Sequence, residues 1–452
     1  QWFTTCRAAM SYLAEHEEGS YVFCEPDVAD TALLEEGPTP VLGDALRPAQ
    51  RDVVERFKLS AKGLVCALAP GSGKTVATAA LLQETSCSSA VIVAAPALHD
   101  QWASALSRFA PSLLLTRPKG EQVKDAYLSF KGVLLLSPRQ AASVLQTAQT
   151  HDVLVIDEAH TLLAGPKTKA SLEVLRTRSK KTLLLTGTPA FKGIKSLGLM
   201  VEFVLNKRCF LNYPLEAEHA LSWEARVGPL LQSGAGHPVE LPNMSRKIVA
   251  IAPTSDDAKA LLVSSENFTT ARTLLDNASD FKAARDARLA VSRASAQLTA
   301  VTAHPGLVLE QPAVGAKASY IADLLQDGKP TVICLHSAKA ARLIERDLTA
   351  AGISSSVLDA SVPPSERAAV VKELGLSLQA LILPENSSTG TDVPQASRLI
   401  HADTPTSAAQ ELQRSSRACR LNSVSDVTEI VYLVLSGFPE ESTAQQFADV
   451  EV

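Results

Sequence analysis

One stretch of the sequence decides the fold class: GLVCALAPGSGKTVATAALLQ, residues 63–83. It begins with the apolar, strand-like run Gly63–Ala69, continues with a glycine-rich loop, and ends in the Ala- and Leu-rich helical segment Val76–Gln83. Glycines allow backbone N–H groups to curl around phosphate oxygens, and a helix N-terminus supplies further donors and a favourable dipole. The stretch therefore predicts a strand, a phosphate-binding loop and a helix in direct succession.

The residues of this loop predict a nucleotide site. In such a loop Lys74 reaches the β- and γ-phosphates, and the Thr75 hydroxyl binds Mg²⁺. A GxGKT sequence can also occur by chance in a turn, and Leu68 stands where the strict pattern has its first glycine. The strand before the loop and the helix after it favour the phosphate site. The predicted ATP-binding residues of the loop are Leu68, Ala69, Pro70, Gly71, Ser72, Gly73, Lys74 and Thr75.

A second stretch supplies acidic groups suited to ATP hydrolysis. The apolar run Val153–Ile156 ends in Asp157 and Glu158, 82 residues after Thr75. Asp157 at a strand end can hold Mg²⁺ through water, and Glu158 can orient and deprotonate the attacking water. The alternative is a strand–helix junction at which Asp157 only caps a helix. Together with the upstream loop, the paired carboxylates predict an ATP site with Lys74, Asp157 and Glu158 as catalytic residues.

Apolar, β-prone runs alternate with helical segments in two separate parts of the chain. The first part has runs at Gly63–Ala69, Ala90–Ala95, Gly132–Leu136, Val153–Ile156 and Thr182–Leu185. The second part has runs at Thr331–Leu335, Ser355–Leu358, Ala380–Leu383, Arg398–His401 and Glu429–Val434. Continuous apolar runs indicate strands buried on both faces, as in parallel sheets with crossover helices. The pattern predicts an α/β fold with two lobes.

The predicted organisation has five parts. Residues 1–45 form an acidic flank, residues 46–208 the first, ATP-binding lobe, and residues 311–436 the second lobe. Residues 209–310 are predicted to be a mostly helical linker or insertion, because Ser255–Thr302 has the pattern of helices broken by polar turns. Residues 437–452 form an acidic tail.

Composition restricts the class of protein. The 452 residues are 46% hydrophobic and 20% charged, the profile of a globular protein with room for about three domains. No apolar run approaches the roughly 18–20 residues of a membrane-spanning helix, so no membrane association is expected. Seven cysteines lie scattered without a CxxC pair, which argues against zinc and a disulfide framework and favours a reducing compartment. An intracellular protein is therefore predicted.

Charge is distributed unevenly along the chain. The net charge of −5 gives no support to nucleic-acid binding, and residues 1–45 carry nine acids against one base. Residues 161–210 carry ten bases against two acids. This basic block contains Lys167, Lys169, Arg176, Arg178, Lys180, Lys181, Lys192, Lys195, Lys207 and Arg208. It can follow a phosphate backbone, and a solvated lysine-rich face is the alternative.

Further short motifs accompany the two nucleotide elements. Pro96–Trp102 is PALHDQW, Asp157–His160 is DEAH, and Leu185–Pro189 is LTGTP. In their order over Leu46–Leu435 the motifs resemble those of the superfamily-two helicase-type ATPases, with the Swi/Snf-type DNA translocases as the nearest branch. The LTGTP version separates this branch from DEAD-box proteins, which carry Ser-Ala-Thr at that place.

The resemblance implies roles for additional residues. Gln50 resembles the amide that recognises adenine, although an ordinary amphipathic helix start explains the same residues. Thr389–Pro394 resembles the motif that contacts both the nucleic-acid backbone and the nucleotide, so Gly390 and Asp392 join the predicted ATP-binding residues. The implied nucleic-acid contacts are Pro96, Gln101, Trp102, Thr186, Gly187 and Thr389.

An arginine-rich segment completes the resemblance. Gln413–Arg420 fits the family pattern QxxGRxxR except that Ser416 replaces the glycine. In a predicted helix Gln413, Arg417 and Arg420 are spaced four and three apart and share one face. Two guanidiniums can stabilise the charge on the γ-phosphate, so Arg417 and Arg420 are predicted to be catalytic. A solvated Arg-rich helix is the alternative.

The resemblance also implies an architecture and an activity. The architecture is two RecA-like lobes whose parallel sheets flank an ATP cleft, with a helical insertion and with ATP and Mg²⁺ as cofactors. The activity is ATP hydrolysis that drives movement along nucleic acid, with double-stranded DNA preferred. RNA or ribonucleoprotein remodelling and a non-catalytic two-lobed scaffold are the alternatives. A larger protein complex and the nucleus are expected, with an organelle as the alternative because the sequence begins at Gln1.

Overall fold

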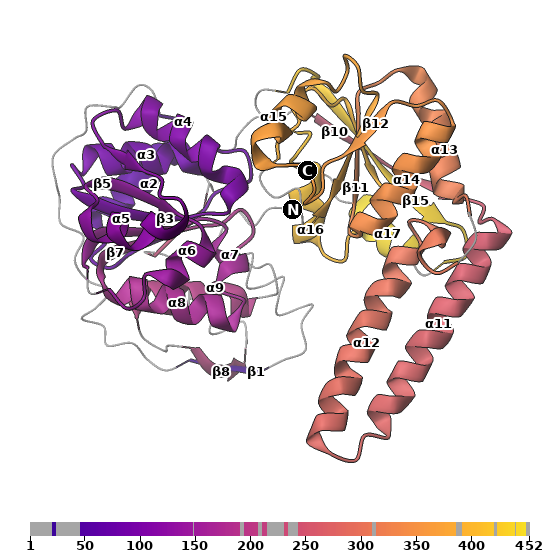
Figure 1. The fold of residues 1–452 in the computed structure, drawn as a ribbon, viewed down its shortest axis with the longest axis horizontal. Coiled ribbons are helices and arrows are strands. Elements are labelled where there is room, and N and C mark those ends of the chain that lie inside the picture. The colour runs from indigo at the N-terminus through magenta and orange to yellow at the C-terminus, as the bar shows by residue number, and fades with distance from the viewer. Residues whose placement is uncertain are drawn as a thin grey trace. The chain divides into compact units, whose positions relative to one another are not determined.

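A computed structural model describes most of the chain. The described residues are 20–23, 46–147, 149–189, 194–206, 210–214, 230–233, 243–309, 313–385, 391–419, 423–438 and 440–448. They divide into two units, Trp2–Val239 and Glu240–Val452, which we call the N-terminal unit and the C-terminal unit. Figure 1 shows a sheet covered by helices in each unit.

A seven-stranded parallel sheet forms the centre of the N-terminal unit. Its strands, in spatial order, are β4 (Leu115–Thr116), β5 (Gly132–Leu136), β3 (Ser89–Val93), β6 (His151–Ile156), β7 (Ser179–Leu185), β2 (Gly63–Ala67) and β9 (Leu231–Ser233). Because β6, β7 and β2 are parallel neighbours, the segments that follow these three strands meet at one edge of the sheet. That edge carries the candidate site.

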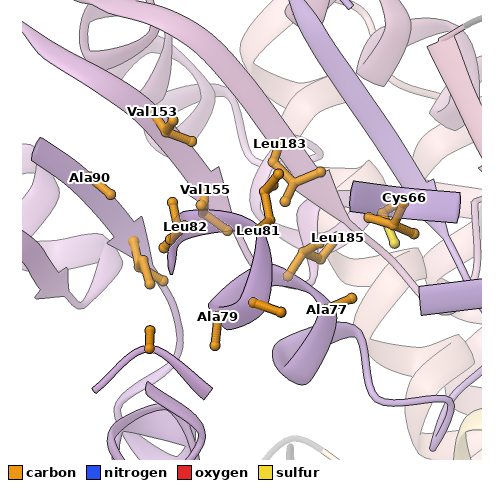
Figure 2. Close-up of a cluster of buried hydrophobic side chains, with 14 of the residues drawn as sticks. Cys66, Ala77, Ala79, Leu81, Leu82, Ala90, Val153, Val155, Leu183 and Leu185 are labelled. Carbon is orange, nitrogen blue, oxygen red and sulfur yellow. The ribbon is translucent and has the colours of Figure 1, made fainter. Parts of the chain in front are cut away.

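Helices cover both faces of this sheet. One face packs against α2 (Pro48–Leu59), α3 (Lys74–Glu84) and α4 (His99–Phe109). The other packs against α5 (Val123–Ser129), α6 (Pro138–Ser143), α8 (Pro166–Thr177) and α9 (Ile194–Leu205), and α7 (Ala159–Leu162) follows β6. Alternate strand residues point to opposite faces, so Val155 contacts the α3 side and Leu154 the α8 side. Figure 2 shows Leu81 and Leu82 of α3 beside Val155 and Leu183.

A separate antiparallel pair also belongs to the N-terminal unit. It joins β1 (Ser20–Phe23) to β8 (Phe210–Pro214), with an irregular register. Short 3₁₀ turns at Pro96–Leu98 and Gly120–Gln122 precede α4 and α5.

A six-stranded parallel sheet forms the centre of the C-terminal unit. Its strands, in spatial order, are β10 (Asn243–Ile251), β15 (Val427–Leu435), β14 (Arg398–His401), β11 (Thr331–Leu335), β13 (Ala380–Pro384) and β12 (Ser355–Val357). Helices α13 (Ala316–Leu324) and α14 (Ala338–Ala350) cover one face. The other face packs against residues of α15 (Pro364–Lys372) and α17 (Glu440–Ala448), and α16 (Ala408–Ser415) lies between β14 and β15 in the sequence.

A long helical hairpin precedes α13. Its helices, α11 (Ser255–Asp276) and α12 (Phe281–Val301), lie side by side and project from the sheet of the C-terminal unit (Figure 1). Thr254 caps α11 by accepting from the Asp257 N–H at 3.1 Å, and Asp280 caps α12 by accepting from the Ala283 N–H at 2.8 Å. The 3₁₀ turns Pro305–Leu307 and Leu325–Asp327 follow α12 and α13.

The structure confirms the predicted α/β class with two parallel sheets, and each predicted apolar run forms a strand. Two short edge strands, β4 and β9, were not predicted. The edge strand β10 alternates between more and less exposed residues. Residues 209–310 contain β8, β9 and β10 besides the two hairpin helices, and the predicted domain boundaries stay a prediction. Among the described residues, no helix combines the length and the apolar character needed to cross a membrane.

Candidate nucleotide site

The loop between β2 and α3 has the geometry of a phosphate cradle. Gly71 and Gly73 adopt left-handed conformations, with φ of 78° and 84°, and α3 begins at Lys74 directly after them. A Cβ on Gly73 would lie 2.3 Å from the Gln50 side-chain nitrogen. Both the backbone conformation and the close approach therefore require glycine at position 73.

Lys74 and Ser72 are bound to the backbone of the same loop. The Lys74 ammonium donates to the carbonyl oxygens of Leu68 at 2.9 Å and Ala69 at 3.1 Å. The Ser72 hydroxyl donates to the Ala69 carbonyl at 2.7 Å. A positive charge thus lies beside the loop at the start of a helix, where phosphate oxygens would be attracted by both. Thr75 is the second residue of α3.

Gln50 supports the loop from α2. Its amide NH₂ donates to the Ser72 carbonyl at 2.8 Å, and its Oε1 accepts from the Arg47 N–H at 3.0 Å. The side chain is buried, so both ends of the amide hold backbone groups. This role differs from adenine recognition, which stays a prediction for Gln50.

The paired carboxylates follow β6 in a strained turn. Glu158 has a left-handed backbone, with φ of 48°, which is uncommon for a residue other than glycine. Asp157 is buried, and its two oxygens accept from the Glu158 N–H at 2.9 Å and the Trp102 indole N–H at 2.9 Å. Burial and the charge of Glu158 raise the pKa of Asp157 to about 6, although Trp102 and Lys74 act to lower it. The site therefore holds a carboxylate whose ionised form is costly, which is typical of functional sites.

His160 joins the carboxylates to the segment after β7. Its Nδ1 lies 2.9 Å from the Thr186 hydroxyl and its Nε2 3.3 Å from the Thr188 hydroxyl. The Thr186 hydroxyl also accepts from the Thr188 N–H at 3.0 Å, and Glu158 Oε2 lies 3.5 Å from His160 Nδ1. Burial and the charge of Lys74 lower the pKa of His160 to about 4, so the ring is neutral near pH 7. We did not predict a role for His160; its place in the DEAH sequence was the available signal.

The LTGTP segment also packs on the phosphate loop. A Cβ on Gly187 would lie 2.9 Å from a ring carbon of Pro70 and 3.6 Å from the Lys74 nitrogen. Any larger residue at position 187 would therefore displace the loop. Three segments far apart in the sequence, 68–75, 157–160 and 186–188, form one site.

The arginine segment lies in the C-terminal unit. Helix α16 ends at Ser415, so the predicted helix carrying Gln413, Arg417 and Arg420 on one face is wrong. Arg417 follows in a turn, is buried, and donates to the Thr391 carbonyl at 3.3 Å, next to the half-buried Asp392. Thr389, Gly390 and Arg420 lie outside the described residues.

Arg414, which was not a predicted site residue, is buried at the centre of a polar network. Its guanidinium donates to Asp403 Oδ1 at 2.7 Å and to Glu385 Oε2 at 3.3 Å. His336 contacts the same two carboxylates, through its N–H to Asp403 at 2.7 Å and its ring to Glu385 at 2.9 Å. The network connects the ends of β11, β13 and β14 to α16.

Comparison with known protein families agrees with this geometry. Residues 44–191 match the family described as "Type III restriction enzyme, res subunit", and residues 316–422 match "Helicase conserved C-terminal domain". The chain is a superfamily-two helicase. Its two domains are those of an ATP hydrolase, and the family uses ATP and Mg²⁺.

Other comparisons give less detail about this helicase. The Sulfolobus solfataricus SWI2/SNF2 ATPase core in complex with double-stranded DNA is similar to it over 92% of each chain, with 19% identity and a TM-score of 0.39. No curated protein matches the sequence.

The donor set of this helicase fits Mg²⁺. The Thr75 hydroxyl and the Asp157 carboxylate are hard oxygen ligands, and a cation would offset the buried negative charge that raises the pKa of Asp157. The described part of the chain contains no group of three or more His, Cys, Asp or Glu side chains placed to hold a metal ion.

The predicted nucleic-acid contacts differ in exposure. Pro96 and Gln101 are exposed, whereas Trp102, Thr186 and Gly187 are buried. The Trp102 indole N–H donates to Asp157, and the Thr186 hydroxyl contacts His160 Nδ1, so both polar groups lie inside the candidate nucleotide site. Of the described contacts predicted on the first lobe, Pro96 and Gln101 are the exposed ones.

Much of the basic block has structural partners. Arg176 donates to the Val204 carbonyl at 2.8 Å, Arg178 to the Leu145 carbonyl at 2.7 Å, and Lys181 to the Lys58 carbonyl at 3.0 Å. Lys180 pairs with Asp152 at 2.7 Å. Lys180 and Lys181 begin β7, so they lie at the amino edge of the sheet, opposite the nucleotide site. Lys192 and Lys207 lie outside the described residues, as does Arg208.

Proposed function

We propose that this helicase is an ATP-driven motor that moves along double-stranded DNA. Lys74 binds the β- and γ-phosphates of ATP, with Gly71 and Gly73 allowing backbone N–H groups to approach them. Thr75 and Asp157 hold Mg²⁺, which neutralises charge on the phosphates when bound. Glu158 orients the attacking water and accepts its proton.

One observation carries the proposal: His160 contacts the threonines of the LTGTP segment from beside Glu158. The distances from its two ring nitrogens to Thr186 and Thr188 are 2.9 Å and 3.3 Å. A movement of Glu158 on hydrolysis would reach Thr186 and Thr188 through the buried His160 ring, whose Nδ1 lies 3.5 Å from Glu158 Oε2. A motor needs such a link between the nucleotide and a second moving segment.

Residues of the C-terminal unit complete the catalytic set. Arg417 and Arg420 stabilise the negative charge that develops on the γ-phosphate, and Gly390 and Asp392 contact the nucleotide. Hydrolysis then depends on both units, so each cycle of ATP binding and release drives a change between them. Sequence resemblance supports these assignments.

Nucleic acid is contacted through its backbone. Pro96 and Gln101 on the first lobe and Thr389 on the second make contacts that carry no base information, so binding is independent of sequence. The QW and LTGTP sequences support duplex DNA as the track. The same resemblance supports action in the nucleus as part of a larger protein complex.

The test compares the ATPase rate of the purified chain under four conditions: no nucleic acid, duplex DNA, single-stranded DNA and RNA. We expect the largest increase with duplex DNA, and displacement of a third strand from a DNA triplex when ATP is added. If RNA alone increases the ATPase rate, the protein is an RNA-remodelling ATPase rather than a DNA motor. ATPase activity that no nucleic acid changes would contradict the proposal.

A further inference from the structure

Trp102 lies at an unexpected place for a residue of a nucleic-acid contact motif. Its side chain is fully buried among apolar residues of α3, α4 and the sheet. Its indole N–H donates to Asp157 Oδ2 at 2.9 Å. Because Asp157 Oδ1 accepts from the Glu158 N–H, each oxygen of this carboxylate has a fixed donor and the group has one orientation.

The segment that carries Trp102 is tied to Asp157 twice. The Asp157 N–H donates to the Val93 carbonyl at 2.9 Å, at the point where β3 ends and the chain turns toward α4. Nine residues after Val93, the indole of Trp102 makes the second link. A shift of the segment between these two positions would therefore move the carboxylate.

The neighbouring residue faces the other way. Gln101 precedes Trp102 on α4 and is exposed, so adjacent residues of one helix turn present a surface amide and a buried indole. Pro96, at the start of the same segment, is also exposed. The first turns of α4 thus connect the surface assigned to the nucleic-acid backbone with a ligand of the nucleotide site.

We infer that Trp102 is a positioning residue that sets the Asp157 carboxylate for Mg²⁺ and reports contact at Pro96 and Gln101 to the ATP site. Contact there rigidifies the first turns of α4, and the indole N–H then holds Asp157 in the orientation that binds the metal. The part concerning nucleic acid rests on the proposed function. The part concerning Mg²⁺ stands on the contacts of Trp102 alone.

The test measures binding of a fluorescent ATP analogue as Mg²⁺ is titrated. Trp102→Phe keeps an aromatic ring in the core and removes the donor, so the Mg²⁺ concentration for half-maximal binding should rise about ten-fold or more, the usual effect of losing a group that orients a metal ligand. Binding in EDTA should stay unchanged. Leu106→Val, a change on the same helix in the same buried cluster, should alter neither value. A Mg²⁺ dependence of Trp102→Phe within two-fold of wild type would overturn the inference.

A second measurement leaves Trp102 intact and so does not depend on the folding of Trp102→Phe. The chain has three tryptophans, so Trp2→Phe with Trp223→Phe makes Trp102 the single emitter. Its emission should change on addition of ADP with Mg²⁺, and less with ADP in EDTA. Equal emission in all conditions would contradict the positioning role.

Duplex DNA separates this inference from the proposed function. DNA should lower the Mg²⁺ half-saturation of wild type several-fold and have little effect on Trp102→Phe. If DNA changes neither protein while the ten-fold Mg²⁺ difference is found, the positioning role stands and the DNA motor fails. If DNA acts equally on both and their Mg²⁺ dependence is the same, the role of Trp102 fails alone.

Discussion

The two parallel sheets carry polar groups at the same place, the carboxyl ends of their strands, and balance their charges in opposite ways. In the N-terminal unit, burial and Glu158 raise the pKa of Asp157 to about 6. In the C-terminal unit, burial acts to raise the pKa of Glu385, but hydrogen bonding to His336 and the charge of Arg414 outweigh it and hold that pKa at about 2.

This difference in pKa indicates which edge favours a bound ligand. At the first edge, burial and the charge of Glu158 outweigh Trp102 and Lys74 in setting the pKa of Asp157, and Glu158 has a left-handed backbone, so a bound cation would be favoured there. The second edge pairs its carboxylates with Arg414 and His336. The first edge therefore favours a bound cation, whereas the carboxylates of the second edge are paired within the protein.

The largest effect is expected when the catalytic base, Glu158, is removed from the first edge. Glu158→Gln should lower turnover by about 10²–10⁴, because an amide cannot accept the proton of the attacking water, while ATP stays bound. Lys74→Ala should lose tight ATP binding instead, since the phosphates lose their main cationic partner. Steady-state ATPase rates and nucleotide binding distinguish the two. Unchanged turnover in Glu158→Gln would show that the carboxylate assignment is wrong.

A second change tests whether the C-terminal unit takes part in chemistry beyond its internal network. Arg420→Ala should lower kcat by about 10³ if the guanidinium stabilises charge on the γ-phosphate, with little change in ATP affinity. Parallel losses of affinity and rate would assign Arg420 to ground-state binding. Full-rate hydrolysis by residues 46–239 alone would refute any need for the second unit.

A third pair of changes compares the edges by stability. Asp403→Ala leaves the buried Arg414 without its nearest carboxylate and should destabilise the C-terminal unit by about 3–5 kcal/mol. Asp157→Asn removes a charge that the fold disfavours and should stabilise the N-terminal unit by about 1–3 kcal/mol at pH 7. Hydrogen exchange of peptides from β14 and from β6 reports each unit separately. If both variants lost the same amount of stability, the two edges would not differ in how their charges are balanced.

The pH dependence of stability sharpens the contrast. The raised pKa of Asp157 gives stability that is present below its usual pKa of 3.8 and is lost as pH rises through about 6. The lowered pKa of Glu385 gives stability that is present above 4.5 and is lost as pH falls through about 2. The urea midpoint of Asp157→Asn should therefore change less with pH between pH 4 and 6 than that of wild type. The urea midpoint of Glu385→Gln should change less with pH between pH 2 and 4.5. If a variant shows the same change of urea midpoint as wild type over its pH range, the shifted pKa assigned to the replaced carboxyl is wrong.

The smallest expected effect concerns the basic block. Each lysine or arginine that neutralises a phosphate steepens the plot of log K against log salt by about 0.9 on duplex DNA. Arg176 is bound to the Val204 carbonyl and Lys169 lies 3.7 Å from Glu173, so Lys167→Ala/Lys169→Ala/Arg176→Ala should flatten the slope by less than about one. A loss close to three would show that all three cations bind phosphate and that this surface is part of the track.

Sequence alone predicted the local elements well. The run Gly63–Gln83 specifies strand, loop and helix because apolar periodicity, glycine conformation and helix propensity act over short distances. Most strands of both sheets follow from continuous apolar runs in the same way, whereas the short edge strands β4 and β9 do not. The edge strand β10 has a weaker pattern, because its residues alternate between exposed and partly buried rather than forming a continuous buried run.

The sequence predicted which residues carry chemistry, and the tertiary structure decided what the described ones among them contact. A motif match placed Trp102 with the nucleic-acid contacts and left His160 and Arg414 without a role, because their partners Asp157, Thr186 and Asp403 come from other strands. The same holds for the arginines of the basic block, whose carbonyl partners lie about 30 positions away along the chain. Hydrogen bonds between distant segments depend on how strands are ordered in the sheet, and no local pattern of residues encodes that order.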